Sequence, residues 1–425
     1  MLDDNEASGN DGRSWLLCRG IKSILRCDEA EVVTGIARYV VSQHRSLRLL
    51  SALIERTKGT PVPALIAFIG WLRSFLAVRA GNRSDGAVWI ARLGNERRAI
   101  ETLPQMLPEL GWTELKFPLV RIVRQRRILM LARRLNRRYE FFKVLRVIEL
   151  IGYYTRYLDI FKNGRFPLAI MSSHSSPHGI AFNLAARKCG VPVVLITHGM
   201  PVRPVARLYY DLAVVHCEAA RQTYVEEGCR MNRVLIHGRR QHYVQMPVGT
   251  LPQRLSVGIF LCKDVNAERL RALVERLLCN QRVSRILIRP HPKNLWVKLD
   301  AWIASLNDSR VRRSFGNSVF RDIEATDIVL AGNSSVLVDA VTAGRPSGYV
   351  SGLDHGSADL HAFVARGLIY PIAAEIKFDP DAMLRFYQRT EWLSVLRLFA
   401  NIDEDEASIM ARVVVAMREL SLRSS

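Results

Sequence analysis

The sequence predicts an α/β protein with two Rossmann-like domains that face a cleft, preceded by a helical N-terminal region. From about residue 167 onward, short apolar runs alternate with helical stretches, and the alternation starts again after a polar break at 239–254. Continuous apolar strands separated by helices are typical of parallel sheets covered on both faces. At 425 residues the chain also exceeds the roughly 250 to 300 at which one hydrophobic core stops growing, so two domains are expected.

The predicted elements divide the chain into four parts. These are a helical N-terminal region at 1–86, a Rossmann-like acceptor domain at 87–245, a Rossmann-like donor-nucleotide domain at 254–400 and a C-terminal helix at 401–425. Apolar runs bounded by turn residues predict strands at 87–93, 168–171, 193–196, 212–215, 234–236, 256–261, 285–289, 328–331 and 348–350. Intervening helices are expected at about 179–187, 267–278 and 336–343.

The chain is strongly basic, with a net charge of +21. Self-repulsion of this size favours an acidic partner, and nucleic acid, an anionic membrane and phosphorylated substrates all qualify. The densest basic stretch, 121–138, predicts a guanidinium-rich helical face that lies on anionic lipid headgroups or holds a polyanionic acceptor. A solvated helix face, and an arginine-rich composition without a partner, are the simpler alternatives.

Targeting signals are not evident. The acidic start of the chain is unlike a secretory signal, and the seven cysteines lack CxxC spacing, so a cytoplasmic protein with reduced thiols is expected. The longest apolar stretch, 63–78, is interrupted by Arg73 and is shorter than the roughly 20 residues that span a bilayer. It predicts a buried or interfacial helix.

Two constellations in the second predicted domain suit an anionic ligand. Arg289, His291 and Lys293 follow a strand, and ligands bind beyond the carboxyl ends of parallel strands. Arginine can bind a phosphate with two hydrogen bonds and histidine can donate one more, although a basic turn would look the same. Asn333, Ser334 and Ser335 stand between another strand and a helix, with Ser334 expected as the N-cap, where backbone N–H groups bind anions.

The first predicted domain offers histidines at two strand ends. His198 follows the strand at 193–196, and its unperturbed pKa near neutrality suits a general base toward an acceptor hydroxyl. His174 and His178 follow the strand at 168–171 and are second candidates, with Arg203 beside the His198 turn. A purely structural role is the alternative for each histidine. The sequence lacks P-loop, zincin, α/β-hydrolase and dinucleotide motifs and clustered metal ligands, so no metal and no cofactor are expected.

The order of these motifs resembles a family of bacterial surface-polysaccharide transferases. Residues 198–203 are similar to the His-Gly-x-Pro-x-basic motif of CDP-glycerol glycerophosphotransferases of the GT-B type. Residues 289–292 and 334–335 are similar to the His-Pro and Ser-Ser motifs that these enzymes share with capsular sialyltransferases. The resemblance covers about 167–370. Gly332 and Asn333 stand where the glycerophosphotransferases have Asp-Tyr, and the acidic base motif of the sialyltransferases has no counterpart.

The resemblance implies a metal-independent transferase in which His198 and His291 are catalytic. Arg289, His291, Lys293, Asn333, Ser334 and Ser335 would bind a nucleotide-activated donor, with a CMP or CDP type favoured. The acceptor would be a glycan or lipid-linked glycan of capsule, lipopolysaccharide or teichoic-acid-like polymer, at an anionic inner-membrane surface. The alternatives are a protein that binds polyanions such as nucleic acid, which the sequence disfavours, and a GT-B-fold sugar-nucleotide epimerase.

Overall fold

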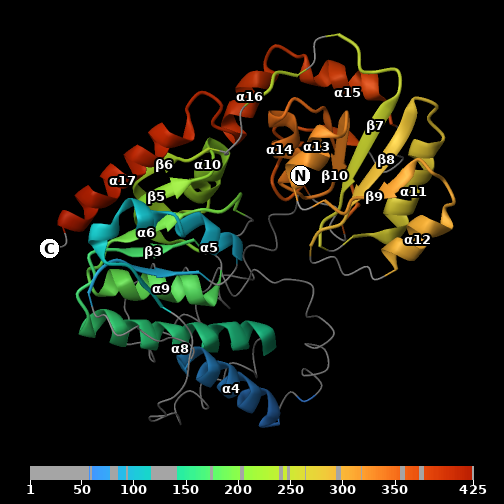
Figure 1. Cartoon of the computed structure of the whole chain (residues 1–425). Coiled ribbons are helices and arrows are strands. Elements are labelled where there is room, and N and C mark those ends of the chain that lie inside the picture. The colour runs from blue at the N-terminus through green and yellow to red at the C-terminus, as the bar shows by residue number, and fades with distance from the viewer. Residues whose placement is uncertain are drawn as a thin grey trace, which may run out of the picture. The chain divides into compact units, whose positions relative to one another are not determined.

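The computed structural model describes residues 57, 60–76, 85–91, 94–115, 141–172, 176–201, 205–238, 243–246, 249–263, 265–292, 298–316, 318–354, 359–372 and 378–423. The chain divides into two compact units (Figure 1). Unit 1 takes Met1–Val215, Ala220–Ile236 and Ala407–Ser425, and unit 2 takes His216–Ala219 and His237–Glu406. The chain therefore leaves unit 1 after β6 and returns to it near its C-terminal end.

Unit 1 is built on a six-stranded parallel sheet in the order β2-β1-β3-β4-β5-β6. Its strands are β1 (Val88–Ile90), β2 (Thr113–Glu114), β3 (Ala169–Met171), β4 (Val193–Ile196), β5 (Tyr209–Val215) and β6 (Arg230–Ile236). The chain runs outward from β1 to β2 and then continues on the other side of β1 with β3. The carboxyl ends of β1 and β3 therefore form a topological switch point, the place where open α/β sheets bind ligands.

Both faces of this sheet are covered, which explains its continuous apolar strands. Alternate strand residues form one core with α8 (Phe141–Asn163) and α9 (Pro177–Lys188). The other residues form a second core with α6 (Leu103–Met106) and α17 (Glu406–Leu422). Helices α5 (Gly94–Ile100) and α10 (Glu218–Glu226) follow β1 and β5. The expected C-terminal helix is thus a structural part of unit 1.

Helix α4 (Val62–Leu76) forms an additional layer of unit 1. It packs on α8, α8 packs on α9, and α9 packs on β3 and β4 (Figure 1). In the part of the chain with described structure, no helix combines the length and apolar composition that crossing a bilayer requires. The expectation of a buried or interfacial helix at 63–78 therefore corresponds to a helix with one face packed on α8.

Unit 2 repeats the parallel architecture with the strand order β12-β11-β10-β7-β8-β9. Its strands are β7 (Leu255–Phe260), β8 (Val283–Arg289), β9 (Val311–Arg313), β10 (Ile328–Ala331), β11 (Ser347–Val350) and β12 (Tyr370–Ile372). Its helices are α11 (Ala267–Leu278), α12 (Leu299–Ser305), α13 (Val319–Glu324), α14 (Val336–Thr342), α15 (Pro380–Tyr387) and α16 (Trp392–Phe399). Here the switch point lies between β7 and β10. Two parallel sheets with flanking helices confirm the predicted fold class.

Candidate functional site

The histidine that the sequence singled out lies beside the switch point of unit 1. His198 follows β4, and Ser172 follows the neighbouring strand β3, so the two residues meet at the carboxyl edge of the sheet. The Ser172 Oγ atom lies 3.0 Å from His198 Nδ1, within hydrogen-bond distance. Ser172 is fully buried whereas His198 is exposed. One ring nitrogen is therefore held from inside the protein while the ring remains accessible.

The protein also adjusts the proton affinity of His198. Although the residue is exposed, the protein around it removes enough water to lower its pKa from the usual 6.5, and the negative charge of Glu96 acts in the opposite direction with a smaller effect. Glu96 is buried on α5, the helix that follows β1. His198 is consequently neutral at pH 7 and lies near a carboxylate that favours its protonated form.

The second-rank candidates of this unit fall into two groups. His178 lies in the core, where its Nε2 atom is 2.5 Å from the hydroxyl of Tyr157 and its ring meets Tyr153 edge to face. Burial raises the pKa of Tyr157, so this phenol stays protonated and can donate the hydrogen bond. His178 therefore supports the packing of α9 on α8, and its burial argues against the acceptor-side role expected from the sequence. His174 and Arg203 lie outside the described residues.

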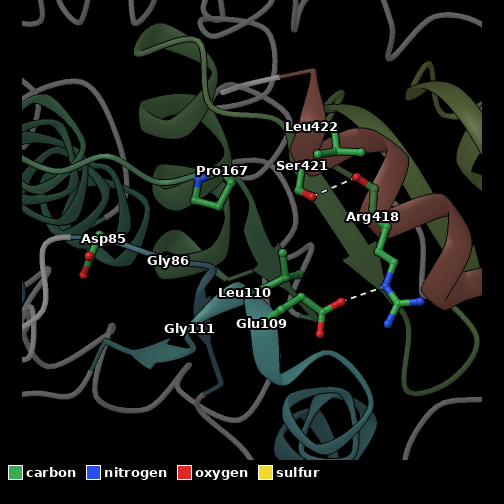
Figure 2. Close-up of a pocket in the computed structure, with 9 residues that line it drawn as sticks. All are labelled: Asp85, Gly86, Glu109, Leu110, Gly111, Pro167, Arg418, Ser421 and Leu422. Carbon is green, nitrogen blue, oxygen red and sulfur yellow. Dashed lines mark hydrogen bonds and ion pairs between the residues drawn. The ribbon is translucent and has the colours of Figure 1, made fainter.

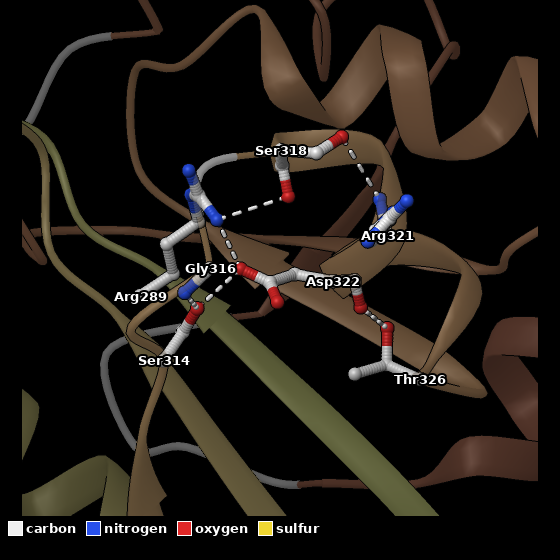
Figure 3. A network of polar contacts seen from close by, with 7 residues as sticks. All are labelled: Arg289, Ser314, Gly316, Ser318, Arg321, Asp322 and Thr326. Carbon is white, nitrogen blue, oxygen red and sulfur yellow. Dashed lines mark hydrogen bonds and ion pairs between the residues drawn. The ribbon is translucent and has the colours of Figure 1, made fainter.

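The carboxyl edge of unit 2 presents His291, which is exposed and is the second residue after β8. Arg289, at the end of the same strand, is held within the protein. Its Nη1 atom forms an ion pair with Asp322 of α13 and donates to the Ser318 carbonyl at 3.1 Å (Figure 3). Arg289 thus fixes α13 to the strand end, and the phosphate contact expected from the sequence stays a prediction. Lys293 lies outside the described residues.

Further contacts complete this network. The Ser314 hydroxyl donates to the Asp322 carboxylate, and the Thr326 hydroxyl donates to the Asp322 carbonyl at 3.2 Å. The side chains of Arg289 and Asp322 are each only 13% exposed. Loss of either partner of such a poorly hydrated ion pair should destabilise the fold, because breaking a buried ion pair costs far more stability than breaking an exposed one.

Asn333 and its neighbours occupy the switch point of unit 2. The backbone N–H of Asn333 donates to Asp354 at 2.5 Å, and its side-chain oxygen accepts from the Leu360 N–H at 2.9 Å. The thiol of Cys262, which follows β7, donates to the Asn333 carbonyl at 3.4 Å. Burial raises the pKa of Cys262 far above its usual range, so the thiol stays protonated. The Asn333 side chain expected to bind donor organises the turn in this structure.

The two serines differ in position. Ser335, rather than the expected Ser334, occupies the N-cap of α14, and its side chain makes no capping hydrogen bond. The Ser334 hydroxyl accepts from the Val336 N–H at 3.4 Å. Ser335 is exposed, and Ser334 is half-buried. Both hydroxyls therefore stand at the carboxyl edge of the sheet beside the β10 strand end.

A pocket of about 700 Å³ lies at the amino-terminal ends of the unit 1 strands. Its walls come from the residues that precede β1, β2 and β3, together with the end of α17 (Figure 2). Arg418 of α17 donates to Glu109 at 2.7 Å across this pocket, and both side chains are about half exposed. The pocket lies at the amino-terminal ends of the strands, whereas His198 follows the carboxyl end of β4, so the two are separate. The ion pair attaches α17 to the segment that precedes β2.

Metal ligands do not gather in the described structure. Within these residues, no group of three or more histidine, cysteine, aspartate and glutamate side chains is arranged to hold a metal ion.

The fold and the two strand-end sites define an α/β protein of two Rossmann-like units. No model of a known protein family matches the chain. No curated protein matches it in sequence.

Solved structures resemble the chain in fold at low identity. The calicheamicin glycosyltransferase CalG4 is 12% identical with a TM-score of 0.49, and the alignment covers 79% of this chain and 98% of that chain. The UDP-GlcNAc 2-epimerase from Neisseria meningitidis bound to UDP-GlcNAc is 12% identical with a TM-score of 0.45, over 78% and 99%. MurG from Acinetobacter baumannii is 12% identical with a TM-score of 0.42, over 79% and 99%. At these values the similarities carry no inference about substrate or reaction.

Proposed function

We propose that the chain is a transferase that moves a sugar or polyol-phosphate unit from a nucleotide-activated donor to a growing bacterial surface glycan. A CMP or CDP donor is favoured by the motif resemblance. The observation that carries the proposal is the placement of His198 at the carboxyl edge of the sheet beside the topological switch point, exposed and with Nδ1 held by the buried Ser172, which follows the switch-point strand β3. A neutral histidine in such a position suits a general base.

On the acceptor side, we assign the Nδ1–H of His198 as the donor to Ser172 Oγ. Nε2 then carries the lone pair and accepts the proton of the acceptor hydroxyl. The lowered pKa keeps this nitrogen unprotonated at pH 7. As the proton transfers, the negative charge of Glu96 stabilises the imidazolium that forms. The acceptor oxygen forms the new bond, and the leaving nucleotide takes the electron pair of the bond that breaks.

On the donor side, the exposed His291 is proposed to contact the donor phosphates, with Lys293 and the hydroxyls of Ser334 and Ser335. Asn333 and Arg289 are proposed to shape this edge through their contacts to Asp354 and Asp322. Positive side chains and hydrogen-bond donors, without a metal, would then stabilise the leaving phosphate. Inversion at the reacting centre is expected for a single displacement. The enzyme would act at the inner face of the plasma membrane.

A thermal-shift panel of CMP, CDP, UMP, UDP and GDP tests the donor site. A ligand at about 100 times its dissociation constant adds about 2.7 kcal/mol of stability, so one cytidine nucleotide should raise Tm clearly. His291→Ala should remove the shift. Arg321→Ala is the matched control, because it removes an exposed positive charge from the same unit, and its shift should equal that of the wild type.

The outcomes separate the alternatives. A response to every polyanion that weakens steeply with salt and ignores the base would replace the transferase with a polyanion-binding protein. An epimerase would convert a nucleotide sugar without an acceptor glycan. A transferase releases nucleotide only when acceptor glycan is supplied. The absence of a Tm shift with any nucleotide, in folded protein, would refute the proposal.

A further inference from the structure

Phe315 presents an aromatic ring to solvent at the carboxyl edge of unit 2. Its side chain is 83% exposed, more than any other large hydrophobic side chain in the described part of the chain. Phenylalanine is one of the residue types most often buried, because an exposed ring keeps a large apolar surface in contact with water. A lone exposed apolar residue is nevertheless common, so the place and the surroundings of this ring decide what it does.

The backbone on both sides of Phe315 is fixed. The Ser314 N–H donates to the Ile288 carbonyl at 2.8 Å, and the Gly316 N–H donates to the Ser314 hydroxyl oxygen at 3.3 Å. A Cβ atom at Gly316 would lie 3.9 Å from Arg289 Nη1, so this backbone rests against the Arg289 side chain (Figure 3). The exposed ring therefore stands on a backbone that its neighbours hold in place.

The ring stands beside the proposed phosphate contact. Strand β9 lies parallel to β8, with Arg313 paired to Ile288 in the sheet register. His291 is the third residue after Ile288, and Phe315 is the second residue after Arg313. Because neighbouring parallel strands are about 4.8 Å apart, the two residues follow adjacent strand ends at the same edge of the sheet. A ligand whose phosphates bind at His291 can therefore reach Phe315 with its remaining part.

Arg313 supports one face of the ring. Its guanidinium carbon lies 5.3 Å from the centroid of the Phe315 ring, a cation–π distance. An ion pair with Asp300 of α12 holds the guanidinium in this place. With one face toward Arg313 and most of the side chain exposed, the opposite face of the ring is open to solvent.

We propose that Phe315 is the platform on which the base of the donor nucleotide stacks. The inference rests on the proposed function and deepens it, because it assigns the base-binding part of the same donor site. A nucleobase is flat and stacks on aromatic side chains, and only a ribose separates it from the phosphates that His291 would contact. Every base has a π face, so stacking adds affinity without selecting among bases. The choice of base then comes from other contacts.

The transferred unit of the donor is the alternative occupant. The apolar face of a sugar ring also packs on an aromatic side chain, because both remove apolar surface from water. Free nucleotides separate the two occupants, since CDP, UDP and GDP contain a base and no transferred unit. A base platform predicts an effect of Phe315 on the binding of these free nucleotides, whereas a sugar platform does not.

Isothermal titration calorimetry of the full chain with CDP, UDP, GDP and inorganic pyrophosphate tests the proposal. The wild type should bind at least one of the nucleotides. Phe315→Ala should weaken that binding by at least about tenfold, because the stacking contact is lost. Where more than one nucleotide binds, the factor should be the same for each. Pyrophosphate has no base and should bind the variant and the wild type equally.

Leu422→Ala is the matched control. Leu422 is 76% exposed on α17 of unit 1, so this variant also removes an exposed large apolar side chain, and its nucleotide affinity should equal that of the wild type. Phe315→Trp should retain the affinity and place a fluorophore on the platform. Its fluorescence, after subtraction of the wild-type signal, should be quenched by the bound nucleotide and unchanged by pyrophosphate. An unchanged Tm of each unliganded variant shows that the fold is retained.

The outcomes distinguish this inference from the proposed function. Nucleotide binding that is equal in the wild type and in Phe315→Ala would overturn the platform and leave the transferase in place. An equal loss of pyrophosphate affinity would also overturn it, because the ring would then act on the phosphate end of the site. Unchanged affinity for the free nucleotides, with weaker binding of UDP-GlcNAc or CDP-glycerol, would assign the ring to the transferred unit instead. A wild type that binds no nucleotide would refute the proposed function, and the platform with it.

Discussion

The two units have equivalent switch points, but the polar residues near them differ in exposure and in hydrogen-bond partners. In unit 1 the fully buried Ser172 holds one nitrogen of His198, and the histidine is exposed to solvent. In unit 2 the carboxylate of Asp354 holds the backbone of Asn333, and the Asn333 side chain is engaged by Leu360. His198 at the first edge is accessible to a ligand, whereas the Asn333 side chain at the second fixes the turn.

Polar residues at a strand end serve two purposes. The carboxyl end of a parallel strand is where ligands bind, and it is also where the chain must satisfy the hydrogen bonds of its turns. Arg289 illustrates the second use, because its guanidinium is paired with Asp322 although it stands two positions before His291, a proposed donor contact. Motif residues at such an edge therefore divide into those that contact ligand and those that hold the edge in place.

The largest expected effect is at the Arg289 ion pair. Arg289→Met retains most of the side-chain volume but leaves the Asp322 carboxylate without its partner, and we expect unfolding to become easier by about 3 kcal/mol. Urea unfolding followed by circular dichroism measures this loss. Adding Asp322→Asn should restore part of it, since the uncompensated charge is removed. Equal stability of Arg289→Met and the exposed control Arg321→Ala would show that Arg289 is free to serve the donor instead.

The glycines at the two edges provide the next test. A Cβ atom at Gly332 would come within 2.3 Å of the Asp354 carboxylate, whereas a Cβ atom at Gly199 would meet nothing within 4 Å. We expect Gly332→Ala to cost about 2 kcal/mol, because the turn must shift to make room. Gly199→Ala should change stability by less than about 0.5 kcal/mol. The same urea measurement on both variants compares the packing of the edges, and equal costs would contradict the difference described above.

Much of the strand pattern is predictable from sequence because buried parallel strands are continuous apolar runs. The expected strands at 193–196 and 328–331 coincide with β4 and β10, and the expected helix at 267–278 coincides with α11. The short edge strands β2, β9 and β12 were missed. They have only two or three residues, β9 ends in a charged pair and β12 has a proline at its centre, so none carries a continuous apolar run.

The polar partners at the sites were harder to predict because they are distant in sequence. Ser172 is 26 residues from His198, and Asp322 is 33 residues from Arg289. Ser172 had a signal, since it directly follows a predicted strand that neighbours the His198 strand. Asp322 and Glu96 lie on short helices, where a carboxylate looks like an ordinary surface residue. Only the packing of those helices brings them to the strand ends.

A smaller effect is expected at Ser172. Ser172→Ala removes the hydrogen bond to His198 Nδ1 and should cost about 1 kcal/mol of stability. The specific effect is on the tautomer of His198. Nitrogen NMR of histidine-labelled protein, with signals assigned through His198→Gln, should show Nε2 unprotonated in the wild type and a mixture of tautomers in Ser172→Ala. A wild-type ring protonated at Nε2 would contradict the assignment of that atom as the base.

The smallest effect concerns the charge near His198. Glu96 raises the pKa of His198 while burial lowers it more, so Glu96→Gln should lower the pKa of His198 further. A base must be unprotonated to act, and the acidic limb of the pH–rate profile should therefore move to lower pH. Because the folded pKa lies below the usual 6.5, the stability associated with neutral His198 is present above pH 6.5 and is lost as pH falls through the folded value. Glu96→Gln should move this loss in the same direction. NMR titration of the His198 ring measures the shift without requiring a substrate, and a pKa that stays constant or rises would show that Glu96 does not act on this histidine.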